Sequence, residues 1–160
     1  MVVIKMPGGD IEVVSSAELQ WMREAFEHEF AGTVMLRVGG NRIFSIESLA
    51  ELRQKFSTDG AGLADFTPPE GDLVNVVNAK NVREVEPANA AQHHERARAV
   101  LKFGARLSLA VRETVGEARA ILAAAGGAAG SLEAAAGRRR TSRGKPRKTT
   151  AKRKTRSKRK

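Results

Sequence analysis

The chain has 160 residues, no cysteine and a formal net charge of +10, a length that allows one modest domain and a tail. The lack of cysteine excludes disulfides, thiolate zinc sites and a cysteine nucleophile. The charge is uneven, because residues 138–160 hold 14 Lys or Arg and no Asp or Glu, whereas residues 1–137 hold 14 basic and 18 acidic side chains. We therefore expect a mildly acidic body with a polyanion-binding tail.

Residues 1–30 predict a β-hairpin followed by a helix. Two apolar runs flank the turn sequence Pro7-Gly8-Gly9-Asp10, which is a hairpin signal. Ser15 and Glu18 have the spacing of a capping box. The following apolar residues recur at intervals of three and four: Leu19, Met22, Phe26 and Phe30. This spacing predicts a helix over 15–30 with one apolar stripe.

A second hairpin and helix are predicted directly afterwards. The runs TVMLRV and RIFSI flank Gly39-Gly40-Asn41, and Leu49, Leu52 and Phe56 share one helical face. The two Gly-Gly turns lie 31 residues apart. The two expected caps, Ser15 and Ser45, and the matching stripe residues lie 30 residues apart. We interpret this as a ββα unit used twice. The alternative is that two short ββα patterns coincide, since two copies do not establish a solenoid.

The next segment is expected to be a loop, a third hairpin and a long helix. Residues 57–72 are rich in Gly, Pro and Asp, which predicts a functional or mobile loop. The runs LVNVV and VREVEP around the turn NAKN predict a hairpin that ends at Pro87. Residues 89–125 carry two adjacent apolar rows, which predict one long helix. That helix either packs on the body or pairs with another copy.

The predicted fold class is therefore α+β: two ββα-like units and a third hairpin, followed by a long helix and a disordered basic tail. The body spans 1–125, an Ala/Gly-rich linker spans 126–137, and the tail spans 138–160. The N-terminus has no cleavable signal, and the uncharged run 120–132 is too short to cross a bilayer. We expect an intracellular protein without a membrane partner.

Enzymatic chemistry is not expected. His28 lies between two glutamates on a predicted helix, where neighbouring side chains do not converge on one metal, and the same holds for His93 and His94. The Gly-Gly turns lack the length and the Lys-Ser/Thr of a phosphate-binding loop. We therefore predict no catalytic residues, no metal site and no cofactor.

The tail carries the predicted binding site. It lacks large apolar side chains and repels itself, so we expect it to be disordered in isolation. Its cations are expected to bind phosphates without reading sequence, because it has no aromatic residues and no zinc-finger spacing. The predicted nucleic-acid-binding residues are Arg138, Arg139, Arg140, Arg143, Lys145, Arg147, Lys148, Lys152, Arg153, Lys154, Arg156, Lys158, Arg159 and Lys160. In composition the tail resembles the Lys-rich tails of linker histones and of some bacterial nucleoid proteins, which supports a binding mechanism but no family.

The expected function is that of a nucleic-acid-associated, histone-like protein, with duplex DNA favoured over RNA as partner. The body would form a homo-oligomer through the long helix or dock an unknown protein. The alternative is an interaction or adaptor protein that its tail only localises, through RNA, a nuclear-import address or an anionic surface. A third idea is a long helix that lies on a hydrophobic granule or membrane. The expected location is the cytoplasm or nucleoid, or the nucleus if the chain is eukaryotic or targeted to a host.

Overall fold

The computed structural model describes residues 1–130, which fold mostly as β-sheet. A two-stranded sheet contains β1 (Val2–Lys5) and β2 (Ile11–Val14). A five-stranded sheet has the order β5-β4-β3-β7-β6, with β3 (Leu19–Glu24), β4 (Val34–Val38), β5 (Asn41–Ser45), β6 (Leu63–Phe66) and β7 (Asn75–Asn78). A three-stranded sheet has the order β10-β9-β8, with β8 (Glu84–Pro87), β9 (Ala99–Lys102) and β10 (Ser108–Val111). All strand pairs are antiparallel.

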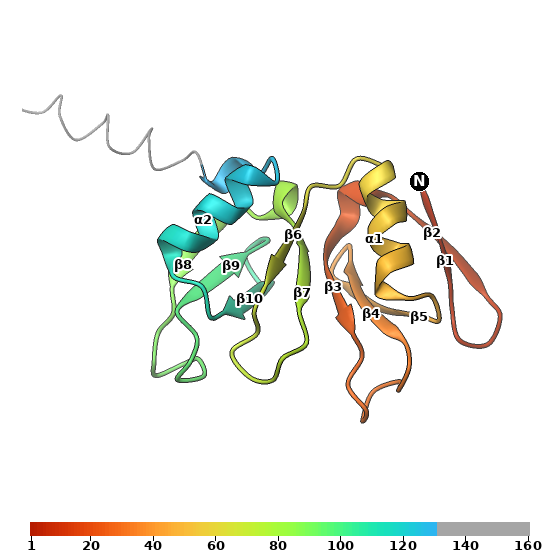
Figure 1. Cartoon of the computed structure of the whole chain (residues 1–160), viewed down its shortest axis with the longest axis horizontal. Coiled ribbons are helices and arrows are strands. Elements are labelled where there is room, and N and C mark those ends of the chain that lie inside the picture. Colours follow the sequence, from red (N-terminus) through yellow and green to blue (C-terminus); the bar gives the residue numbers. More distant parts are fainter. Residues whose placement is uncertain (131–160) are drawn as a thin grey trace, which may run out of the picture.

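Two ten-residue helices and three 3-10 turns complete the described chain. The helices are α1 (Leu49–Thr58) and α2 (Val115–Ala124). The 3-10 turns are η1 (Ser16–Glu18), η2 (Ala79–Asn81) and η3 (Ala128–Gly130). Figure 1 shows the hairpin β1–β2 at one end of the long axis and β8–β10 at the other, with the five-stranded sheet between them. The two helices lie along one side, and the long loops point to the opposite side.

The five-stranded sheet separates two hydrophobic cores. Val2, Ile4 and Val14 of the first hairpin pack in one core with Leu52 and Phe56 of α1. The other core lies against the opposite side of the sheet, where side chains of β8, β9, β10 and α2 meet Trp21, Phe66 and Val77. The central strands of this sheet are therefore covered on both faces.

Two predicted hairpins and one predicted helix are confirmed. β1 and β2 pair around the Pro7–Asp10 turn, and β4 and β5 pair around Gly39-Gly40. Gly39 and Gly40 have φ values of +56° and +83°, which an L side chain rarely adopts. Helix α1 begins after Ser48, whose side chain accepts a hydrogen bond from the N–H of Glu51 in a capping box. The expected cap, Ser45, is instead the last residue of β5.

The predicted helix over 15–30 is wrong. The capping box of Ser15 and Glu18 exists, but it closes only the single turn η1, and the chain then extends into β3. Trp21 and Met22 are both buried, because β3 lies between the two cores and each face of the strand is covered. A strand buried on both faces does not alternate apolar with polar residues, so the apolar residues of this segment could match the spacing of a helix.

The predicted long helix over 89–125 is also wrong. Residues 99–102 and 108–111 form β9 and β10, and only Val115–Ala124 is helical. Ala99, Val100 and Leu101 are consecutive and buried, which again gave a continuous apolar signal without strand alternation. Self-association through a long helix has no basis in this fold.

The predicted third hairpin and the predicted ββα repeat need correction as well. The strands β7 and β8 exist, but β7 pairs with β3 and β6, whereas β8 pairs with β9. Part of the predicted loop 57–72 is the end of α1 and strand β6. The first half of the predicted repeat contains no α-helix, so the chain is not a pair of ββα units in that register. Its class is mostly β-sheet with two short helices.

Candidate functional site

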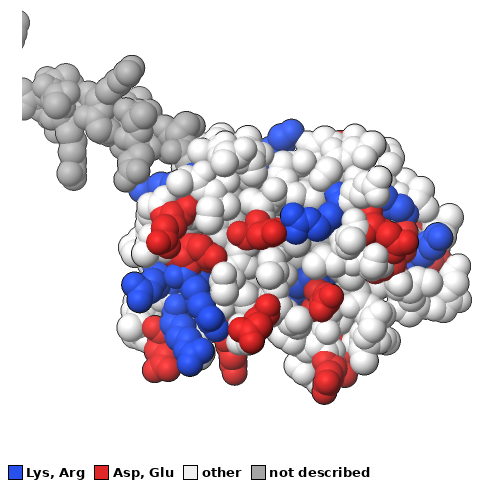
Figure 2. Space-filling model, viewed as in Figure 1, with Lys and Arg blue, Asp and Glu red and all other residues white. Residues whose placement is uncertain are grey.

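The fourteen predicted nucleic-acid-binding residues, Arg138 to Lys160, lie outside the described residues. The described chain ends with η3, which contacts α2 and buries Ala129. Within residues 1–130 there are 14 basic and 17 acidic side chains. Figure 2 shows these charges intermixed on one face, with Lys and Arg gathered over the β8–β9 connection beside acidic groups. The body therefore shows no continuous basic surface in this view.

The three histidines lie in two of the long loops that point to the same side of the molecule in Figure 1, and not on helices. His28 is in the β3–β4 loop, and its ring stacks on Phe26 with centroids 5.4 Å apart. His93 and His94 are in the β8–β9 loop, where their Nδ1 atoms accept hydrogen bonds from the N–H groups of Asn89 and Arg96. Among residues 1–130 there is no cluster of three His, Cys, Asp or Glu side chains that could hold a metal ion.

A groove of about 330 Å³ lies where three loops meet, and we call it the loop-end groove. The β3–β4 loop contributes Phe26, the β6–β7 loop contributes Pro68, Pro69 and Leu73, and the β8–β9 loop contributes His94. These are the three long loops that point to the same side in Figure 1. The lining is mainly apolar, and it contains no Ser, Thr or Cys beside the imidazole. Such a groove suits the binding of an apolar or aromatic group.

An ion pair fixes one wall of the loop-end groove. The Arg23 guanidinium donates to both Glu29 carboxylate oxygens, at 2.8 and 3.0 Å, and stacks over the Phe26 ring at 3.9 Å. The Phe26 N–H also donates to Glu29 at 3.0 Å. The hydrogen bonds from Arg23 lower the pKa of Glu29 to about 2, with smaller help from Phe26 and Arg42. The carboxylate therefore stays ionised at neutral pH and holds Phe26 in place.

A second arginine holds the opposite loop. Arg112 follows β10, and its Nε donates to the Pro69 carbonyl at 3.3 Å while its Nη2 donates to the Gly71 carbonyl at 3.2 Å. The sequence interpretation missed this groove because Phe26 was assigned to a helical stripe. The signal that did point to it was the Gly-, Pro- and Asp-rich composition of the segment that contains Pro68 and Pro69.

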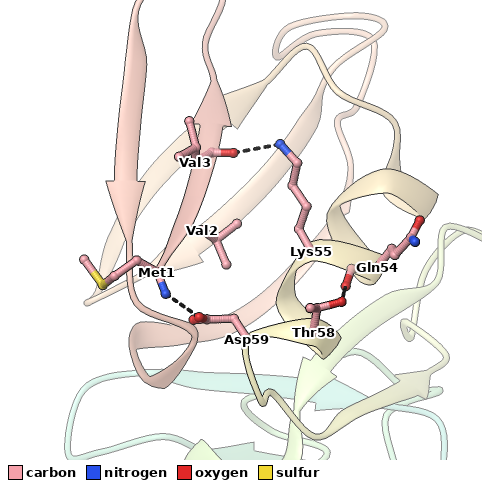
Figure 3. A pocket seen from close by; sticks show the side chains of 7 residues that line it. All are labelled: Met1, Val2, Val3, Gln54, Lys55, Thr58 and Asp59. Atoms are coloured by element: carbon pink, nitrogen blue, oxygen red, sulfur yellow. Dashed lines mark hydrogen bonds and ion pairs between the residues drawn. The ribbon is translucent and has the colours of Figure 1, made fainter.

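Another groove, of about 440 Å³, lies between β1 and the end of α1 (Figure 3). Lys55 donates to the Val3 carbonyl at 2.9 Å and also pairs with Glu47. The N-terminal ammonium pairs with Asp59 and holds the pKa of that carboxyl below its usual range. Each charged group at this groove thus has a partner, and the contacts of Lys55 and of the N-terminal ammonium hold β1 against the helix.

No described helix is long and apolar enough to cross a membrane. Neither a family model, nor a curated protein, nor a solved structure matches this chain.

Proposed function

We propose that this chain is a nucleic-acid-associated protein in which the tail 138–160 binds phosphates without sequence preference, with duplex DNA favoured over RNA. The observation that carries the proposal is the charge of the tail, 14 basic side chains and no acidic one. Cations that neutralise phosphates release condensed counterions, so such a tail gives strong binding at low salt. The protein would then reside at the nucleoid, or in the nucleus of a eukaryotic cell.

The charge of the body supports this division of roles. Residues 1–130 have three more acidic than basic side chains, so the body alone should repel a polyanion weakly. The body is then free to contact a protein or a further copy of the chain. Linking several tails through such contacts would raise the affinity for a long polyanion by avidity.

The test is a salt titration of binding to duplex DNA and to structured RNA. Three proteins are compared: the natural chain, a chain whose 14 tail Lys and Arg are replaced by Gln, and a chain whose tail residues are shuffled. We expect a steep log–log salt dependence for the natural chain, with a slope of up to about −13 if every charge engages. The shuffled tail should bind equally well, whereas the Gln tail should not bind. Undiminished binding by the Gln chain would refute the proposal.

A protein-interaction module is the second candidate, and the exposed aromatic residues favour it. Phe26 and Phe30 are 38% and 54% exposed, and Phe26 borders the mainly apolar loop-end groove. Here the body would bind a partner, and the tail would only localise the complex. The two functions differ in one observable result: removal of residues 138–160 abolishes activity in the first and only changes the location in the second.

A further inference from the structure

The described chain consists of two copies of one structural unit, in a register that differs from the predicted repeat. Unit 1 (residues 1–60) contains a hairpin, the turn η1, a three-stranded sheet and α1. Unit 2 (residues 62–126) contains the hairpin β6–β7, the turn η2, the sheet β8–β10 and α2, in the same order. Ser15 and Asn78 occupy equivalent positions, because each precedes its 3-10 turn and accepts a hydrogen bond from the N–H two positions later.

The same long-range hydrogen bonds close the first strand of both units. In each unit, one residue at the end of the first strand or directly after it makes both bonds. Its N–H donates to a glutamate side chain, and its carbonyl accepts from the N–H of the residue before that glutamate. The bonds are Lys5 N to Glu47 (3.0 Å) with Ile46 N to Lys5 O (3.0 Å), and Thr67 N to Glu113 (2.9 Å) with Arg112 N to Thr67 O (3.0 Å). Lys5 is thus equivalent to Thr67, and Glu47 is equivalent to Glu113.

The helices also correspond residue by residue. Ser48 and Glu51 form the capping box of α1, and Thr114 and Glu117 form that of α2. The buried pair Leu52 and Phe56 of α1 corresponds to Ala118 and Leu122 of α2. Gly60 and Gly126 follow the two helices with φ values of +95° and +84°. The two units therefore match in their helix caps, their buried residues and their hydrogen bonds. Each strand of one unit, and each edge of its sheet, thus has an equivalent in the other unit.

The joint between the units shows how one unit binds the next. Strand β3 of unit 1 pairs with β7 of unit 2, with Trp21 opposite Val77 and Met22 opposite Val76. The strand equivalent to β3 is β8, and the strand equivalent to β7 is β2. Both lie at the edge of their sheets, without a strand on the outer side in the part of the chain that the structure describes. At β1 and β6, Glu47 accepts from the N–H of Lys5, and Glu113 accepts from the N–H of Thr67, directly after β6.

The outer face of hairpin β1–β2 carries exposed apolar side chains, which are more typical of a buried surface. Met1, Val3, Ile11 and Val13 are 74%, 43%, 66% and 51% exposed. Val13 is equivalent to Val76, which is fully buried in the core of unit 1. Met1 is equivalent to Leu63, which packs against the same core. At two of these four positions, Met1 and Val13, the first hairpin therefore exposes an apolar side chain whose equivalent in the second hairpin is packed in a core.

We propose that a second copy of this chain covers this face, with β2 of one copy pairing in antiparallel register with β8 of the next. In this arrangement Val13 lies opposite Val85, as Val76 lies opposite Met22 within the chain. The hairpin and β8 lie at opposite ends of the long axis (Figure 1), so the contact is head-to-tail. Head-to-tail contacts produce rings or open filaments, according to whether the rotation closes. This inference goes beyond the proposed function and does not depend on it.

The first test is sedimentation of the full chain over a range of concentrations in about 1 M salt after nuclease treatment, because high salt screens tail-mediated bridging. We expect the mean mass to rise with concentration and the variant I11K/V13K to remain a monomer. The matched control is V74K, because Val74 occupies the position equivalent to Ile11 and is 42% exposed. A natural chain that stays monomeric, or a V74K variant that dissociates equally, would overturn the proposal.

The second test uses the lack of natural cysteine to report which surfaces meet. Full-length V13C and V85C variants are mixed under mild oxidation. Directly opposed residues on antiparallel strands have Cβ atoms about 4.5–5.5 Å apart, close enough for a disulfide after small adjustment. We expect V13C–V85C dimers in the mixture and none in either variant alone. Dimers of V13C alone would show a symmetric contact and overturn the head-to-tail arrangement. Salt-dependent DNA binding is measured separately, so its failure leaves this result unaffected.

Discussion

Replacement of Glu29 by Gln tests whether the Arg23–Glu29 pair stabilises the loop that carries Phe26. Both side chains are largely buried, with 13% of Arg23 and 10% of Glu29 exposed. The variant keeps the size of the side chain and one acceptor oxygen, but it removes the charge. Because Arg23 would keep its charge with a weaker partner, the folded protein should lose stability.

The pKa of Glu29 gives the size of the effect. A fall from the ordinary value of 4.5 to about 2 in the folded protein corresponds to roughly 3 kcal/mol, at about 1.36 kcal/mol per pKa unit. Partial exposure and salt reduce this figure, so we expect a loss of about 1.5–3 kcal/mol for Glu29→Gln at pH 7. The loss should shrink as acid protonates the glutamate in the unfolded state.

The sign of the pH dependence follows from the lowered pKa. The stabilisation is fully present above about pH 5 and is lost as the pH falls through 4.5 towards 2, because the unfolded chain takes up the proton first. At pH 3.5 about two fifths of the difference between the natural chain and the variant should be gone. A group with a raised pKa would give the opposite trend.

Urea unfolding followed by tryptophan fluorescence measures these free energies. Trp21 is the only tryptophan, and it is buried with its ring centroid 5.1 Å from that of Phe103. The matched control is Glu27→Gln, which removes an exposed carboxylate from the same loop and should change the free energy of unfolding by less than about 0.5 kcal/mol. The reasoning is refuted if Glu29→Gln behaves like this control at pH 7, or if its deficit does not shrink by pH 3.5.

Further predictions concern backbone packing and the contacts between the units, each measured by urea or thermal unfolding. A Cβ at Gly62 would lie 2.1 Å from the Ala125 carbonyl oxygen, so Gly62→Ala should destabilise by about 3 kcal/mol. Gly116 in α2 has open space around it, so Gly116→Ala should instead stabilise by about 0.5–1 kcal/mol, and equal effects at both glycines would contradict the packing. The buried Asn78 side chain accepts from the Gly62 N–H within unit 2 and donates to the Ser16 carbonyl of unit 1, so Asn78→Ala should cost about 2–3 kcal/mol. A loss below about 0.5 kcal/mol would contradict a stabilising role for these two bonds.

Local signals in the sequence predicted the parts of the fold that depend on few neighbours. The turn glycines at Gly39 and Gly40 predicted the β4–β5 hairpin, because only glycine adopts their positive φ without strain. The stripe of Leu49, Leu52 and Phe56 predicted α1. The uneven charge of body and tail is likewise a property of composition alone.

The candidate site could be predicted only in part. The Gly-, Pro- and Asp-rich segment indicated a functional or mobile loop, and its residues Pro68 and Pro69 line the loop-end groove. The groove also needs Phe26 and His94, which come from loops that the sequence assigned to helices. Which loops meet depends on the pairing of β7 with β3, two strands that lie far apart along the chain, and no local pattern encodes that pairing.

The sequence by itself determined the acidic body and basic tail, two hairpins and the helix α1, because turn residues, a helical apolar stripe and charge are local properties of the chain. Only the tertiary structure decided that Trp21–Met22 and Ala99–Leu101 are strands, since their burial on both faces by two cores removes the alternation that identifies a strand. It also revealed the duplicated unit, whose spacing is not constant along the chain and whose shared features are hydrogen bonds and burial. Within residues 1–130, the strand order leaves β2 and β8 at sheet edges, and no local pattern in the sequence encodes that order.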